Sequence, residues 1–161
     1  MIKIRSGIGY DIHRLVPGDG LMLGGVKVSS DLKAEAHSDG DVLVHSLIDA
    51  LLGAMGQPDI GELFPDSDPA YKGADSLKLL AHVMGLAEER GYRLGNLDAT
   101  IIAQMPKMAP HIQTMRGNIA RVLNADVGQV NVKATTEEGL GFSGAGEGIA
   151  AHAVVLMLSN G

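Results

Sequence analysis

The chain lacks several residue types, and each absence excludes a class of function. Its 161 residues include no cysteine and no tryptophan, and only two phenylalanines and three tyrosines. Without cysteine the chain can form neither a disulfide nor a thiolate metal site, so a metal centre must be built from histidine and carboxylates. With a formal net charge of -6 and few aromatic rings, the chain also lacks the basic, base-stacking surface of a nucleic-acid-binding protein.

Long hydrophobic runs are missing as well. No apolar stretch reaches the ~20 residues that a membrane helix needs, and the first residues, Met1 to Arg5, do not resemble a signal peptide. We therefore expect a cytoplasmic protein with neither a membrane nor a nucleic-acid partner, although a mature organellar protein would have the same features. The length fits a single catalytic domain over residues 1–161.

The residues that are present alternate between strand-like and helix-like patterns. β-Branched residues between Ile2 and Arg14 predict a strand, and residues 21–28 predict a hairpin with glycines at its turn. An apolar period of three to four residues predicts a helix that starts near Asp39, is capped by Ser38 or Asp39, and stops at Gly53 or Gly56. Further helices are expected over 76–90 and 110–123, strands over 97–104, 130–136 and 149–158, and a structureless, functional loop over 57–75. The pattern predicts an α/β (α+β) fold in which a mixed β-sheet packs against helices.

Asp11, His13 and His45 have the residue types of a metal site. Residues two apart in a strand point to the same face, so Asp11 and His13 can share one ion, and His45 can approach from the predicted helix. The alternative is a hydrogen-bonded polar cluster in the core. Three protein ligands leave one coordination position open, which is typical of catalytic zinc, although imidazole and carboxylate also suit iron(II) or manganese.

Three other segments carry candidate binding residues. Residues 59–68 are rich in carboxylates that could bind a metal-phosphate or a polyol, or could simply be a solvated acidic loop. Residues 103–108 lie just after one predicted strand and residues 133–138 end another, and there backbone amides and the hydroxyls of Thr135 and Thr136 can contact phosphate. The alternatives are an ordinary strand-to-helix connection and the strand propensity of threonine.

Six sequence blocks occur together along the chain: Gly9–Arg14, Ala36–Val42 with His45, Asp59–Gly61, Phe64–Asp68, Gln104–Met108 and Asn131–Thr136. Taken together, they resemble the 2-C-methyl-D-erythritol 2,4-cyclodiphosphate synthase family over nearly the whole chain. The resemblance implies a homotrimer with active sites between subunits, in the non-mevalonate isoprenoid pathway. It also implies a phosphorus-oxygen lyase that converts 4-diphosphocytidyl-2-C-methyl-D-erythritol 2-phosphate to the 2,4-cyclodiphosphate and CMP.

The resemblance further implies a role for each motif residue. Asp11, His13 and His45 would bind zinc or another divalent metal, while Mg²⁺ or Mn²⁺ would bridge the substrate diphosphate. His37 and Thr136 would stabilise the transition state. The erythritol phosphate would be bound by Ser38, Asp59, Ile60, Gly61, Phe64, Pro65, Asp66, Ser67 and Asp68. The neighbouring subunit would contribute the cytidine diphosphate pocket, and Phe142 would lie near the substrate phosphate; the pocket residues are Ala103, Gln104, Met105, Pro106, Lys107, Met108, Ala109, Ala134, Thr135, Thr136, Glu137 and Glu138.

Two other functions are compatible with the metal motif. A mononuclear zinc phosphoesterase would use His37 or Asp41 as a base to activate water. In a trimeric binding protein held together by its metal, removing zinc would sharply lower thermal stability, and a His45→Ala change would disrupt assembly rather than turnover.

Overall fold

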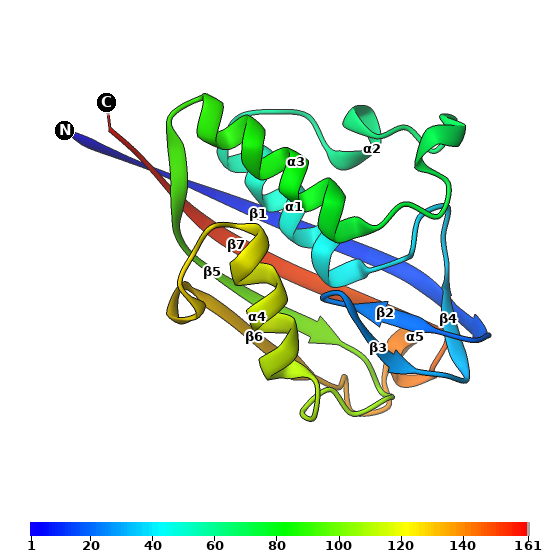
Figure 1. The fold of residues 1–161 in the computed structure, drawn as a ribbon. Helices are drawn as coiled ribbons and strands as arrows, with labels where there is room; N and C mark the ends of the chain where they lie inside the picture. Colours follow the sequence, from blue (N-terminus) through cyan, green and yellow to red (C-terminus); the bar gives the residue numbers. More distant parts are fainter. Residues whose placement is uncertain (161) are drawn as a thin grey trace.

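A five-stranded mixed β-sheet forms the framework of the molecule in the computed structural model, which describes residues 1–160 (Figure 1). The sheet has the order β4-β1-β7-β5-β6, and all neighbours are antiparallel except the parallel pair β5 and β6. The strands are β1 (Ile2–Pro17), β4 (Leu32–Glu35), β5 (Tyr92–Ile102), β6 (Val130–Thr135) and β7 (Gly148–Asn160). The predicted mixed sheet packed against helices is therefore confirmed.

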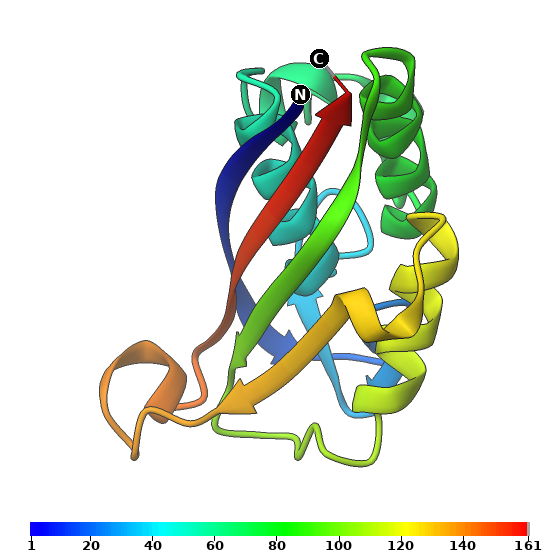
Figure 2. The same cartoon turned by 90° about the vertical axis from the view of Figure 1, so that its left-hand side faces the viewer.

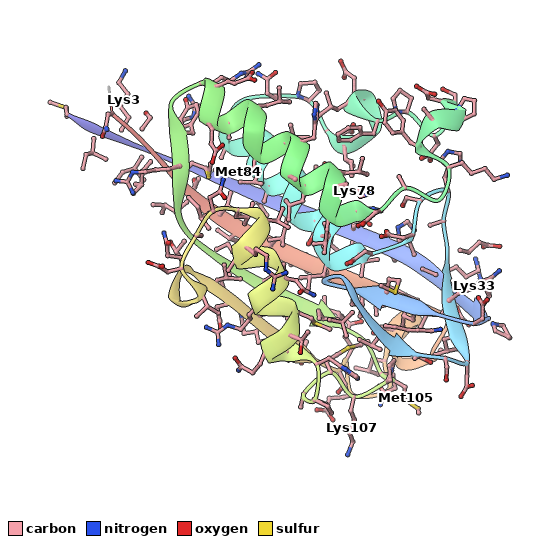
Figure 3. All side chains as sticks on the ribbon, in the orientation of Figure 1. Lys3, Lys33, Lys78, Met84, Met105 and Lys107 are labelled. Atoms are coloured by element: carbon pink, nitrogen blue, oxygen red, sulfur yellow. The ribbon has the colours of Figure 1, made fainter. Side chains whose placement is uncertain are left out.

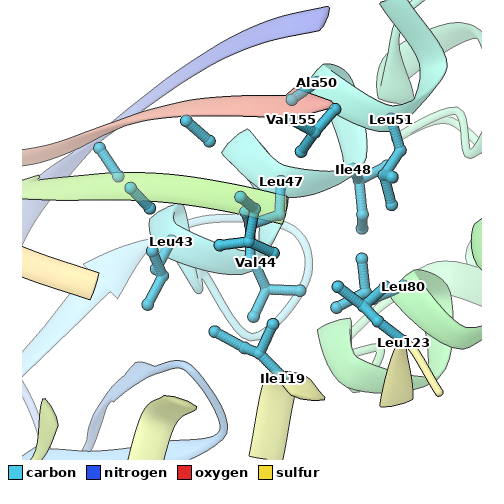
Figure 4. Close-up of a cluster of buried hydrophobic side chains, with 14 of the residues drawn as sticks. Leu43, Val44, Leu47, Ile48, Ala50, Leu51, Leu80, Ile119, Leu123 and Val155 are labelled. Carbon is cyan, nitrogen blue, oxygen red and sulfur yellow. The ribbon is translucent and has the colours of Figure 1, made fainter. Parts of the chain in front are cut away.

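Three helices cover one face of this sheet and bury the core between the two layers. They are α1 (Val42–Ala54), α3 (Ser76–Glu89) and α4 (Ile112–Val122), and Figure 2 shows the strands in front of them. Leu47 and Ile48 of α1, Leu80 of α3 and Ile119 of α4 are completely buried (Figure 4). The remaining elements are short: β2 (Leu21–Leu23), β3 (Val26–Ser29), α2 (Ile60–Leu63), η1 (Pro69–Tyr71), η2 (Val127–Gln129) and α5 (Gly141–Gly144).

The sequence-based boundaries were wrong in three places. Strand β5 begins at Tyr92, five residues before the predicted start at Leu97. Helix α1 is capped by Asp41, whose carboxylate accepts a hydrogen bond from the Val44 amide, and not by Ser38 or Asp39. The segment 57–75 is not structureless, because it contains α2 and η1, which Asp59 and Asp68 cap. Both segments are too short for a helical period to show in the sequence. The predicted hairpin is confirmed as β2 and β3, which turn through Gly24 and Gly25 at positive φ.

The two faces of β1 differ in the way that the two-residue strand period requires. Gly7, Gly9, Asp11 and His13 lie on the side of helix α1, whereas Ile4, Ile8 and Ile12 are exposed on the opposite side. A Cβ atom on Gly9 would lie 1.8 Å from the backbone oxygen of Ser46. The two glycines therefore allow α1 to lie directly on β1, next to Asp11 and His13.

Within residues 1–160, none of the helices is both long enough and apolar enough to cross a bilayer.

Candidate active site

Asp11, His13 and His45 meet where the N-terminal half of α1 packs on β1. The Asp11 Oδ2 atom lies 3.1 Å from His13 Nε2 and 3.1 Å from His45 Nδ1. One ligand atom from each of the three side chains lies within 4.8 Å of the others, so the three residues could hold a metal ion. The predicted grouping of these residues is confirmed. It joins two residues on the same face of β1 to a helix residue that lies 34 positions from Asp11 along the chain.

The close approach of α1 to β1 produces this geometry. The backbone oxygens of Ser46 and Ala50 fit against Gly9 and Gly7, where a side chain would collide with them. His45 is the residue before Ser46, so the same contact brings its ring to Asp11 and His13. The two imidazole rings have centroids 5.7 Å apart and an interplanar angle of 77°.

The electrostatics of the cluster keep the carboxylate ionised. Burial raises the pKa of Asp11, but contacts with the imidazoles of His13 and His45 outweigh burial and bring this pKa down to about 2. Burial lowers the pKa of His45, and the neighbouring carboxylate of Asp11 outweighs that effect, so the pKa is raised overall. The site therefore has an anionic ligand at neutral pH, as a divalent cation requires.

Two buried nitrogen atoms have no hydrogen-bond partner within residues 1–160, the Nε2 atoms of His13 and His37. Unpaired buried polar atoms are costly, so they indicate a missing ligand. The His13 atom lies 3.1 Å from Asp11 Oδ2 without the alignment of a hydrogen bond. Two imidazoles and one carboxylate are ligands that suit zinc, so the residues fit a bound divalent metal.

A cavity of about 380 Å³ opens beside the three ligands. Five of the residues predicted to bind substrate line this cavity together with His37, and they come from the segments before α1 and around α2: Ser38, Ile60, Gly61, Phe64 and Asp66. Asp59 and Asp68 instead use their carboxylates as local helix caps, each accepting a backbone hydrogen bond at 2.9–3.0 Å. Four predicted residues of the same segment do not line the cavity, and their binding roles remain predictions: Asp59, Pro65, Ser67 and Asp68.

The residues predicted to bind cytidine diphosphate lie elsewhere. Gln104 and Met105 line a second hollow of about 470 Å³, and none of residues 103–109 or 134–138 lines the first cavity. In Figure 3 the side chains of Met105 and Lys107 extend from the end of the molecule, away from its body. Ala103 and Met108 are buried, so their side chains cannot contact a ligand without rearrangement. The ring of Phe142 packs near Gly148, next to the backbone oxygen of His13.

Comparison with known proteins assigns this arrangement to a family. The YgbB family matches residues 4–158. The chain belongs to the YgbB family. The 2-C-methyl-D-erythritol 2,4-cyclodiphosphate synthase of Pelobacter propionicus is 65% identical over 158 residues, which cover 98% of this chain and 100% of that protein. The enzyme of the same name from Clostridioides difficile is 54% identical and covers 96% of both chains.

Solved structures show the same family fold. The bifunctional IspDF of Campylobacter jejuni superimposes with a TM-score of 0.96 at 44% identity, over 99% of this chain and 43% of that one. IspF of Plasmodium falciparum, in complex with CDP, superimposes with a TM-score of 0.86 at 38% identity, over 98% of this chain and 97% of that one.

Asp41, one of the two residues that a phosphoesterase could use as a base, has a structural role in this YgbB-family chain. The Asp41 carboxylate is fully buried, and it accepts hydrogen bonds from the amides of Gly24, Gly25 and Val44, each at 3.0 Å. Burial raises its pKa to about 6. Because all three contacts are to backbone amides and Asp41 does not line the cavity, it ties the β2–β3 turn to α1 and has no route to a water molecule in the site.

Several residues near the site escaped the sequence analysis. Glu35, Tyr71 and Leu79 line the cavity, and Ser76 contacts His45. Asp49 follows His45 by one helical turn, and its Oδ1 atom accepts a hydrogen bond of 2.8 Å from the Ile60 amide. The spacing of Asp49 from His45 was a usable signal, because residues four apart share a helix face. No sequence signal pointed to Ser76, since only the fold brings it to His45.

Proposed function

We propose that this protein converts 4-diphosphocytidyl-2-C-methyl-D-erythritol 2-phosphate to 2-C-methyl-D-erythritol 2,4-cyclodiphosphate and CMP. The observation that carries the proposal is the Asp11, His13 and His45 set at the wall of a cavity that His37, Ser38, Ile60 and Gly61 also line. The names of the relatives, at identities up to 65%, support the same reaction. No observation favours a zinc phosphoesterase, and the buried, fully bonded carboxylate of Asp41 removes one of its two candidate bases.

The proposed reaction is an internal phosphoryl transfer. An oxygen of the 2-phosphate attacks the β-phosphorus, the bond between that phosphorus and the oxygen bridging to the α-phosphate breaks, and CMP leaves with this oxygen. No water is consumed, which makes the protein a lyase. Because the second pKa of a phosphate monoester is ~6, the nucleophile is largely a dianion at neutral pH and needs no general base. Positioning of two anionic groups and neutralisation of their charge remain the main requirements.

The residues of the cavity can meet these requirements. Asp11, His13 and His45 would hold a divalent metal, which we propose is zinc, and a bound metal of this kind supplies positive charge to phosphoryl oxygens. Nε2 of His37, which is buried and has no hydrogen-bond partner among residues 1–160, is available to donate a hydrogen bond to a phosphoryl oxygen. The amide of Gly61, a residue that lines the cavity, is available for a hydroxyl of the erythritol chain, whereas the Ile60 amide already donates to Asp49 and the Asp59 carboxylate already caps α2. Mg²⁺ or Mn²⁺ would accompany the substrate diphosphate.

We propose that the cytidine diphosphate pocket comes from a neighbouring subunit of a homotrimer. Residues 103–109 and 134–138 do not line the cavity in their own chain, so a contribution to it requires another copy. An exposed apolar surface on the far face of β1 and β7 provides a surface for such assembly, because patches of this kind commonly form interfaces; it comprises Ile2, Ile4, Ile8, Tyr10, Ile12 and Val154. CDP in the relative from P. falciparum supports a cytidine nucleotide as the ligand. That residues 1–161 form one catalytic domain, and that it works in the cytoplasm, remain predictions.

Phosphorus NMR tests the reaction. The purified protein is incubated with the proposed substrate, zinc and magnesium, in parallel with an Asp11→Ala variant. We expect CMP and a cyclic diphosphate in equal amounts, the latter seen as two coupled resonances. The variant should form neither product. Linear phosphate products that carry ¹⁸O from labelled water would instead indicate a phosphoesterase. Unchanged substrate in the presence of folded, metal-loaded protein would leave only a binding function.

A further inference from the structure

The ring of His45 is held from both sides. Its Nδ1 atom lies 3.1 Å from Asp11 Oδ2, on the side of the candidate metal site. Its Nε2 atom lies 2.7 Å from the hydroxyl oxygen of Ser76, on the opposite side of the ring, and 3.2 Å from the hydroxyl of Ser38. Ser76 is the first residue of α3 and is completely buried.

The hydroxyl of Ser76 has only one proton, and a second contact determines where it points. Both side-chain oxygens of Asp39 contact Ser76: Oδ1 accepts from the Ser76 hydroxyl, and Oδ2 accepts from the Ser76 backbone amide at 2.9 Å. A carboxylate only accepts hydrogen bonds, so the hydroxyl proton must lie on the Asp39 side. The Ser76 oxygen can then only accept from His45 Nε2, which must carry a proton.

We propose that Ser76 and Asp39 are positioning residues, which hold the proton of His45 on Nε2 and leave Nδ1 as the metal-binding atom. This inference rests on the metal site of the proposed function. Metal-binding histidines generally donate their second ring N–H to a neighbouring group, which sets the tautomer and the ring orientation. Here the acceptor is a hydroxyl that a carboxylate polarises in turn. The three residues Asp39, Ser76 and His45 are called the Asp39–Ser76–His45 chain below.

The same chain connects the metal ligand to the wall of the cavity. The backbone amide of Asp39 donates to the Ala74 oxygen at 3.2 Å, and the Gly73 amide donates to the His37 oxygen at 2.8 Å. The segment that carries His37 and Ser38 is therefore bonded to the segment that leads into α3. Asp39 belongs to the first segment and Ser76 to the second, so one set of contacts orients both His45 and the backbone of His37.

Zinc affinity tests the inference, because it does not depend on turnover. Competition with a chromophoric chelator gives the zinc dissociation constant of the wild-type chain and of Ser76→Ala, in which His45 Nε2–H loses its acceptor. We expect zinc binding to be weakened about 10- to 100-fold, the range for loss of a partner that orients a ligand. An Asp39→Asn variant keeps an acceptor for the Ser76 hydroxyl but lacks the negative charge of the carboxylate, and we expect a smaller loss of zinc affinity.

A matched control separates this role from a general effect on α3. Asp75 caps α3 by accepting a 3.0 Å hydrogen bond from the Leu77 amide, and within residues 1–160 no hydrogen bond or ion pair joins it to His45. Asp75→Ala should lower the thermal midpoint while leaving zinc affinity unchanged. In addition, ¹H–¹⁵N NMR of the zinc-bound wild type should show a slowly exchanging proton on His45 Nε2, which Ser76→Ala should lose.

The outcomes distinguish the inference from the site on which it rests. Two results would overturn the role of the Asp39–Ser76–His45 chain while leaving the metal site intact. One is wild-type zinc affinity in both Ser76→Ala and Asp39→Asn. The other is an equal loss of zinc affinity in Ser76→Ala and Asp75→Ala. A wild-type protein that binds no zinc would overturn both. If Ser76→Ala does not fold, Asp39→Asn alone decides the matter.

Discussion

The two regions proposed to form the active site differ in how complete they are within one chain. At the metal end, Asp11, His13 and His45 come from two elements that pack directly on each other, and additional hydrogen bonds hold the ligands. The proposed nucleotide loops, residues 103–109 and 134–138, are largely exposed and do not line the cavity beside the three ligands. The difference supports the proposal that one chain preorganises the metal site, whereas nucleotide binding depends on a neighbouring subunit.

The physical basis of this difference is the cost of burying polar groups. His45 can be buried, and Asp11 half-buried, because the two side chains contact each other and His45 also contacts the Ser76 hydroxyl. Thr135 and Thr136 have no comparable partners: the hydroxyl of Thr135 donates to the oxygen of Thr136, and that of Thr136 accepts from the Glu138 amide. Exposed residues with only local hydrogen bonds remain available for a ligand or for a neighbouring subunit.

The largest effect is expected at the metal end. Asp11→Ala removes the only carboxylate of the ligand set, and we expect turnover to fall by about 10³-fold or more, since a metal ion contributes several kcal/mol to such reactions. Zinc content should fall in parallel, while the far-UV circular dichroism stays unchanged. Normal zinc content with lost turnover would contradict the ligand assignment.

A change in the support beneath the metal end should have the next largest effect. Gly9→Ala places a Cβ 1.8 Å from the Ser46 oxygen, so α1 must move away from β1. We expect a loss of about 3 kcal/mol in the free energy of unfolding, together with weaker zinc binding. Gly85→Ala is the matched control, because Gly85 lies in α3 with no atom within 4 Å of the added Cβ. It should stabilise the protein by up to about 1 kcal/mol.

Asp41→Asn distinguishes support from chemistry. The amide group of asparagine would put an N–H donor opposite one of the three backbone amides that now donate to Asp41. We expect a loss of roughly 1–3 kcal/mol in urea unfolding, with turnover of the folded protein nearly unchanged. A large fall in turnover without a loss of stability would revive Asp41 as a base.

The smallest effect is expected in the nucleotide loops. Lys107 is exposed, so Lys107→Ala should alter neither the thermal midpoint nor zinc affinity. If the lysine contacts a substrate phosphate, KM should rise about tenfold, which corresponds to one hydrogen bond to a charged group. Steady-state kinetics beside a zinc titration would test this, and an effect on zinc binding would contradict the separation of the two regions.

The sequence allowed some of these features to be predicted and concealed others. The grouping of Asp11, His13 and His45 followed from the strand period and from a strongly periodic helix. The Asp39–Ser76–His45 chain did not, because it depends on how the segment before α1 meets the start of α3. The start of α1 at Val42 was missed because Ser38, Asp39 and Asp41 are all good cap residues, and only the fold selects Asp41 through its contacts with Gly24 and Gly25.

The most direct test of a divided active site uses mixed trimers. Asp11→Ala, which lacks the metal end, and Thr136→Ala, which is altered in the nucleotide loops, are co-expressed with different tags and purified through both tags. If each site takes one region from each of two neighbours, every mixed trimer has one intact site, and roughly a third of wild-type activity should return. Mixed trimers of Asp11→Ala and His45→Ala subunits, which both lack the metal end, should recover no activity. Activity no higher than that of the single variants would contradict the account, because both regions would then act within one chain.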